Sequence, residues 1–147
     1  MNGQNNGKEQ KRILVIEDDL QVQLAIRDLM RSVGYDAVGE SDWWEALRLM
    51  KENPFDLAIV DIHLSQVGTR PLTGLDLIPL LRTLKPRMPV VVMSAYGDQQ
   101  FRATGLKQGA AIYLEKPVEP VHLMRIVHRL LNDEIDQEQT ALKHGPC

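Results

Sequence analysis

Two hydrophobic patterns alternate along the chain. Short apolar runs without internal alternation are typical of strands that are covered on both faces of a sheet. Such runs occupy residues 13–16, 57–60, 89–93 and 111–114, and a weaker strand is expected over residues 36–40. Between them, apolar residues recur every three or four positions, which predicts amphipathic helices. Strand–helix repeats with connections of this length predict one parallel sheet with helices on both faces.

Capping residues and prolines predict where the helices begin and end. Gly34 follows the first helical pattern and favours its termination. Asp42, with Glu45 three residues later, favours the start of the second helix. Pro120 lies in the first turn of the last helix, where proline is tolerated. Pro79 lies inside the third helical pattern, and we expect it to delay the start of that helix or to kink it.

Trp43 and Trp44 are adjacent at the start of the second helix. Neighbouring side chains on a helix point in different directions, so both cannot face the core. One tryptophan is therefore expected on the surface. It either contacts a partner or is a partly shielded surface aromatic, which is the commoner outcome.

Composition narrows the class of protein. The 147 residues are 44% hydrophobic and 25% charged with a net charge of −3, which indicates one soluble globular domain rather than a generic nucleic-acid binder. The only cysteine is Cys147, so no disulfide forms within the chain, and a reducing compartment is expected. No apolar run has the length of a membrane span, and the N-terminus lacks the apolar core of a signal peptide, so we expect a cytoplasmic protein.

Polar side chains follow the predicted strands at the edge of the sheet where their carboxyl ends meet. Glu17 and Asp18 follow the first strand, Asp61 the third, Ser94 the fourth and Lys116 the fifth. Parallel α/β sheets bind their ligands at this edge. Three carboxylates suit a hard cation such as Mg²⁺. An ammonium and a hydroxyl opposite that cation would complete a cradle for a phosphoryl group.

Each of these residues also has a purely structural interpretation. Ser94 is compatible with a helix cap, Lys116 with a solvated surface charge, and the nearby Tyr113 with a half-buried core aromatic. Their joint placement at one edge favours a site instead. A zinc site is not favoured, because the histidines lack ligand spacing with one another or with a cysteine: His63, His122, His128 and His144.

Four segments follow one another along the chain: ILVIEDD, FDLAIVDIHL, VVMSA and YLEKP. On these residues, the segment from 11 to 132 resembles the response regulator receiver domain of two-component signalling, the CheY-like family. The resemblance implies an α/β flavodoxin-like (βα)5 three-layer sandwich, with a five-stranded parallel sheet in the order 2-1-3-4-5. Residues 1–10 are expected to be a disordered tail, and residues 133–147 a C-terminal tail or helix extension.

The resemblance also implies roles for the residues at the sheet edge. Asp61 would be the phosphoacceptor that forms an aspartyl phosphate. Mg²⁺ would be bound by Asp18, by Glu17 through water, by Asp61 itself and by the backbone carbonyl of His63. Lys116 would pair with the phosphoryl oxygens, and the peptide bond from it to the following proline would be cis.

A conformational switch is implied as well. Ser94 would hydrogen-bond the phosphoryl group, and Tyr113 would turn inward with it. The readout face would consist of the fourth helix, the fifth strand and the fifth helix. The implied function is a phosphorylation-dependent signalling switch. It would be a phosphoacceptor regulatory domain rather than an enzyme, one that assists its own phosphorylation and slow autodephosphorylation.

The same resemblance implies the partners. The phosphodonor would be a sensor histidine kinase or a phosphotransfer protein. The output would pass to a downstream protein target or to an output domain removed from this chain, and a homodimer through the readout face is a further mode of output. Neither direct nucleic-acid binding by this domain nor membrane association is expected.

Two features depart from the family pattern. The glycine expected eight residues after the acceptor corresponds to Gly74, thirteen residues after Asp61, so the loop of residues 65–73 is longer than usual. This loop is either a neutral insertion or a modulator of phosphodonor access. His63 and Tyr96, two residues after the acceptor and after the switch serine, are bulky at positions that tune attack by water. Slow autodephosphorylation is therefore expected.

Three other functions share parts of this pattern. A flavodoxin-like cofactor binder would need a glycine-rich or Ser/Thr-rich phosphate loop after the first strand, where carboxylates stand instead. An aspartyl-phosphate hydrolase would need a second carboxylate where His63 stands. The remaining alternative is a phosphorylation-independent protein-interaction or dimerisation module with the same fold, and the complete acceptor set argues against it.

Overall fold

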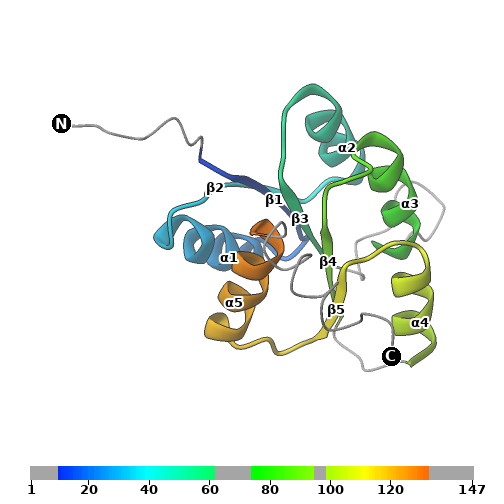
Figure 1. Ribbon diagram of the computed structural model, residues 1–147. Coiled ribbons are helices and arrows are strands. Elements are labelled where there is room, and N and C mark those ends of the chain that lie inside the picture. Colours follow the sequence, from blue (N-terminus) through cyan, green and yellow to red (C-terminus); the bar gives the residue numbers. More distant parts are fainter. Residues whose placement is uncertain (1–9, 62–73, 95–98, 133–147) are drawn as a thin grey trace, which may run out of the picture.

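A five-stranded parallel sheet forms the centre of the protein (Figure 1). The computed structural model describes residues 10–61, 74–94 and 99–132. The strands lie in the order β2-β1-β3-β4-β5, and every neighbouring pair is parallel, which confirms the predicted topology. Their bounds are β1 Arg12–Ile16, β2 Asp36–Glu40, β3 Leu57–Asp61, β4 Val90–Ser94 and β5 Ile112–Glu115.

Helices cover both faces of the sheet. In Figure 1, α1 and α5 lie on one side of it, and α2, α3 and α4 lie on the other, which confirms the three-layer sandwich. Within the described ranges, none of the helices is long and apolar enough to cross a membrane. Their bounds are α1 Leu20–Ser32, α2 Trp43–Glu52, α3 Gly74–Leu84, α4 Gln99–Lys107 and α5 Pro120–Leu131.

Two apolar clusters fill the space on either side of the sheet. In β3, Ala58 and Val60 contribute to the cluster that packs against α2 and α3, whereas Leu57 and Ile59 contribute to the cluster against α1 and α5. All four residues are at most 1% exposed. A strand that is buried on both faces needs apolar residues at every position, which explains the uninterrupted apolar runs in the sequence.

Most predicted helix ends are confirmed. The carboxylate of Asp42 accepts a hydrogen bond from the Glu45 amide at 3.0 Å at the start of α2. Gly34 has a φ of 100° just after α1, a conformation that glycine adopts without strain. Pro120 is the first residue of α5.

Of the two expected effects of Pro79, the delayed start is contradicted, while the kink stays a prediction. The helix α3 begins at Gly74 and runs through the proline. A proline inside a helix costs about 3 kcal/mol or more. Leu77, Ile78 and Leu81 are completely buried. Burial of each such side chain contributes about 1.5–3 kcal/mol to the stability of the fold. Packing of this helix face therefore outweighs the loss at Pro79.

The tryptophan pair divides between core and surface, as predicted. Trp43 is 3% exposed and belongs to the cluster that packs against α2, whereas Trp44 is 60% exposed. The first turn of α2 thus buries one indole and presents the other to solvent.

Candidate functional site

The carboxyl ends of four adjacent strands place five polar side chains at one edge of the sheet. Glu17 and Asp18 follow β1, Asp61 ends β3, Ser94 ends β4 and Lys116 follows β5. Glu17, Asp61 and Ser94 are 2%, 5% and 0% exposed. Polar side chains are seldom this buried unless partners or a function hold them there. The structure therefore brings the five residues together where the sequence predicted them.

Glu17, Asp18 and Asp61 form an acidic cluster. One possible ligand oxygen from each carboxylate lies within 4.8 Å of those from the other two. Carboxylate oxygens are ligands that hard cations prefer: Ca²⁺ binds about six to eight oxygens, and Mg²⁺ binds one or two carboxylates together with waters and phosphate oxygens. The acidic cluster therefore fits a divalent cation by both its spacing and its chemistry.

Lys116 lies beside two of these carboxylates. Its Nζ is 3.2 Å from Glu17 Oε1 and 3.3 Å from Asp61 Oδ1. Its backbone amide donates to the Ser94 carbonyl at 2.6 Å, and its peptide bond to Pro117 is cis, as expected. The chain leaving β5 thus holds the ammonium next to Asp61.

Burial and charge shift the pKa values of two groups in the site. The pKa of Glu17 is raised to about 7, first by burial and then by a hydrogen bond to Asp61 and by the charge of that residue. Burial alone would lower the pKa of Lys116, but the charges of Asp61 and Glu17 raise it above its usual value. The raised pKa of Glu17 favours its protonated form, and a cation in the cluster would compete with that proton.

Gln23 is a polar side chain near the site that sequence reasoning missed. It lies on α1, is 5% exposed, and its Nε2 donates to the Glu17 carbonyl and to the Ser41 hydroxyl, at 2.9 Å each. Asp19 caps α1 and donates its amide to the Glu17 carboxylate at 3.2 Å. A helix is recognised from the spacing of its apolar residues, so a buried glutamine gives no signal in that pattern.

Tyr113 packs inward against α4. Its side chain is 4% exposed, and its hydroxyl has no hydrogen-bond partner among the described residues. A Cβ added at Gly105 of α4 would lie 3.3 Å from Cδ2 of the tyrosine ring, so the glycine leaves room for the ring. The ring is therefore buried in this structure, and the switch role that the resemblance implied for Tyr113 stays a prediction.

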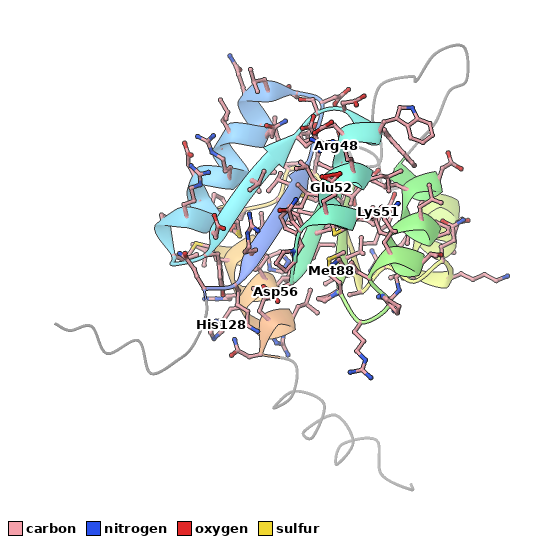
Figure 2. The ribbon with its side chains drawn as sticks, turned by 90° about the horizontal axis from the view of Figure 1, so that it is seen from above. Arg48, Lys51, Glu52, Asp56, Met88 and His128 are labelled. Atoms are coloured by element: carbon pink, nitrogen blue, oxygen red, sulfur yellow. The ribbon has the colours of Figure 1, made fainter. Side chains whose placement is uncertain are left out.

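Three predicted features lie outside the described residues: His63, Tyr96 and the loop of residues 65–73. Of the histidines, His122 is exposed, and His128, labelled in Figure 2, is exposed near the end of α5. Within the described ranges, the acidic cluster is the one group of three or more His, Cys, Asp or Glu residues that could hold a metal ion.

The sequence matches a known family over most of its length. Residues 13–128 match the family model described as the response regulator receiver domain. One curated relative is the transcriptional regulatory protein ZraR of Klebsiella oxytoca, which is 32% identical over 111 residues, or 76% of this chain. The match covers 24% of that relative, so the chain spans about a quarter of its length.

Two similar solved structures contain a divalent cation. One is a response regulator protein from Burkholderia pseudomallei, with a phosphorylated aspartic acid, a calcium ion and citrate. It is 28% identical to this chain with a TM-score of 0.70, and the match covers 92% of this chain and 75% of that one. The other is the receiver domain of a sensor histidine kinase from Pseudomonas aeruginosa, with a magnesium ion in its active site cleft. It is 26% identical to this chain with a TM-score of 0.73, and the match covers 84% of this chain and 99% of that one. With the strand order, the edge of polar residues and the family match in agreement, the chain belongs to the response regulator receiver domain family.

Proposed function

We propose that this chain is a phosphorylation-dependent signalling switch. Asp61 accepts a phosphoryl group, in the presence of Mg²⁺, from a phosphohistidine of a sensor histidine kinase or a phosphotransfer protein. The observation that carries the proposal is the position of Lys116, whose Nζ lies 3.3 Å from Asp61 and 3.2 Å from Glu17 at the acidic cluster. A purely structural ion pair would need one carboxylate for this ammonium, not three at the same edge.

Asp61 supplies the nucleophile. One of its carboxylate oxygens attacks phosphorus, the P–N bond to the donor imidazole breaks, and the bonding electrons return to the imidazole nitrogen. The product is an acyl phosphate on Asp61. Lys116 then faces the phosphoryl oxygens, and opposite unit charges about 4 Å apart attract by about 4 kcal/mol at an effective dielectric constant of about 20.

The acidic cluster would hold the Mg²⁺. Glu17, Asp18 and Asp61 provide carboxylate oxygens, and the backbone carbonyl of His63, outside the described residues, is proposed as a further ligand. When bound, the cation neutralises charge on the phosphoryl oxygens during transfer. The calcium ion in the phosphorylated Burkholderia structure and the magnesium ion in the Pseudomonas structure support such a site in this chain.

The switch would consist of Ser94 and Tyr113. Ser94 is completely buried at the end of β4, and its hydroxyl would bond a phosphoryl oxygen once Asp61 is modified. Tyr113 is inward in this structure, so phosphorylation would increase the population of a position that the ring already occupies. Output would pass through the face formed by α4, β5 and α5, to a downstream protein, an attached output domain or a second copy of the chain.

The lifetime of the phosphorylated state would depend on side chains outside the described residues. His63 and Tyr96 would hinder the attack of water on the acyl phosphate, and the loop of residues 65–73 would modulate access of the phosphodonor. The switch would occupy residues 11–132 between tails of residues 1–10 and 133–147. A phosphoryl lifetime of seconds would contradict the proposed slow hydrolysis.

Intact mass measured after incubation with acetyl phosphate tests the proposal. A single phosphoryl adduct is expected with Mg²⁺, and no adduct is expected without it or in the Asp61→Asn variant. Asp28→Asn, which changes an exposed carboxylate on α1, should be modified like the wild type. An equal adduct on Asp61→Asn would overturn the assignment of the acceptor. A folded wild-type protein that takes up no phosphoryl group would favour the phosphorylation-independent interaction module instead.

A further inference from the structure

Gln23 joins the acidic cluster to the neighbouring strand. It is 5% exposed, although glutamine is mostly a surface residue and burial of its amide is costly without hydrogen bonds. Its Nε2 donates to the Glu17 carbonyl oxygen and to the Ser41 hydroxyl, at 2.9 Å each. Glu17 follows β1 and Ser41 follows β2. One side chain of α1 therefore ties two strand ends together.

The bond to Glu17 restrains more than one residue. The Glu17 carbonyl belongs to the peptide group that joins Glu17 to Asp18, and a peptide group is planar. Fixing its oxygen fixes the direction in which the chain leaves Glu17, and with it the starting points of both carboxylate side chains. On the other side of Glu17, its amide donates to the Glu40 carbonyl at 3.1 Å. Gln23 thus restrains the one peptide that carries two members of the acidic cluster.

Gly39 of β2 provides the space for this glutamine. A Cβ added at Gly39 would lie 2.3 Å from Oε1 and 2.7 Å from Cδ of Gln23, closer than such atoms approach one another. Glycine weakens the interior of a strand, and it often marks a place where another group comes close. The glutamine side chain therefore occupies the position that any larger residue at 39 would fill.

We propose that Gln23 is a positioning residue for the divalent cation site. It does not touch the cation. It holds the peptide between Glu17 and Asp18 so that both carboxylates converge with Asp61, against the repulsion that would separate them. The inference rests on the proposed function, because it takes the acidic cluster to be the Mg²⁺ site.

Titration of the ¹⁵N-labelled full chain with MgCl₂, followed by NMR, tests this role through the dissociation constant for Mg²⁺. In Gln23→Ala the constant should rise roughly tenfold, the lower end of the range seen when hydrogen-bonding partners of metal ligands are removed. Ser41→Ala should leave it unchanged, because the bond from Gln23 to Glu17 remains. Ile26→Val is the control for stability, since Ile26 is buried on the same helix. It should lower the unfolding midpoint without changing the constant.

Gly39→Ala provides an independent variant that leaves Gln23 in the chain. The added methyl group should displace the amide and weaken Mg²⁺ binding as Gln23→Ala does. The double variant should bind Mg²⁺ like Gln23→Ala alone, because no amide is left for the methyl group to displace. Unfolding midpoints measured without Mg²⁺ accompany every titration.

The outcomes separate this inference from the proposed function. A wild-type protein that shows no Mg²⁺-dependent shifts overturns the proposed function, and the inference with it. If the wild type binds Mg²⁺ and Gln23→Ala binds it equally well, only the inference fails. It also fails if Ile26→Val weakens binding as much as Gln23→Ala, since the effect would then follow stability.

Discussion

The two edges of the sheet differ in how their carboxylates are held. At the edge where the strands begin, Arg12 lies 2.8 Å from the carboxylate of Asp36, and Asp56, labelled in Figure 2, accepts a hydrogen bond from the Arg12 amide at 2.8 Å. At the edge where the strands end, the described residues place three carboxylates near one ammonium, and the pKa of Glu17 rises to about 7. At the first edge each of these carboxylates has a hydrogen-bond donor within the fold, whereas at the second edge the spacing of the three carboxylates fits a divalent cation.

This contrast separates structural charges from functional ones. A partly exposed pair such as Arg12 and Asp36 contributes at most about 1 kcal/mol to stability. Carboxylates crowded together in a buried site destabilise the folded state, and proteins retain such groups chiefly where they bind or react. The cluster of carboxylates at one edge therefore marks the site more reliably than any single residue there.

Removal of the Lys116 ammonium should have the largest effect, on the rate of phosphorylation. In Lys116→Met, phosphorylation by acetyl phosphate should slow by about 100-fold or more, because a fixed group that stabilises developing charge is lost. The affinity for Mg²⁺ should rise, because the carboxylates lose the ammonium beside them. Lys51→Met, which changes an exposed lysine on α2 (Figure 2), is the control for both measurements. Equal phosphorylation rates in the two variants would contradict the role of Lys116.

Glu17 should make the metal-free protein less stable as the pH rises. Its pKa is about 7 in the folded state against a usual 4.5, so its stabilising effect is complete below pH 4.5 and is lost as the pH rises through about 7. Relative to Glu17→Gln, the wild type should lose up to about 3 kcal/mol between about pH 5 and about pH 8. Urea unfolding without metal measures this loss, and Mg²⁺ should reduce it. Parallel pH profiles for the two proteins would rule out the raised pKa.

Removal of the Tyr113 hydroxyl should have a smaller effect, on stability. The hydroxyl is buried without a hydrogen-bond partner among the described residues, so Tyr113→Phe should raise the free energy of unfolding by about 1 kcal/mol. Urea unfolding of the unphosphorylated protein measures the change. A loss of stability would mean that the hydroxyl is bonded in solution.

A substitution at the edge where the strands begin should have the smallest effect. Asp36→Asn removes one partner of a half-exposed ion pair, so stability should fall by less than about 1 kcal/mol. Phosphorylation of Asp61 should be unchanged, because the pair lies at the opposite end of the strands. A marked fall in the phosphorylation rate would show that the two edges are coupled.

The sheet and the main site residues were predictable because they depend on local sequence. A strand buried on both faces needs an apolar run, as in β3 and β4, and parallel strands end at a common edge. Glu17, Asp61 and Lys116 could therefore be placed together from their positions directly after such runs. The order of the strands came from the resemblance of those segments to a family and not from the runs themselves.

Other features depended on contacts between distant parts of the chain. The helix α3 tolerates Pro79 because of the packing of its buried face, which the sequence of the helix alone does not show. The space above Gly39 is filled by Gln23 from another element, and no periodic pattern connects the two positions. Which tryptophan of the pair is buried was likewise decided by how α2 packs against the core.

The most direct test of this account locates the phosphoryl group on the chain. After phosphorylation by acetyl phosphate with Mg²⁺, reduction with borohydride converts an acyl phosphate into a stable alcohol that peptide mass spectrometry can locate. We expect this conversion at Asp61 alone. Conversion at Glu17, at Asp18 or at a carboxylate away from the acidic cluster would contradict it.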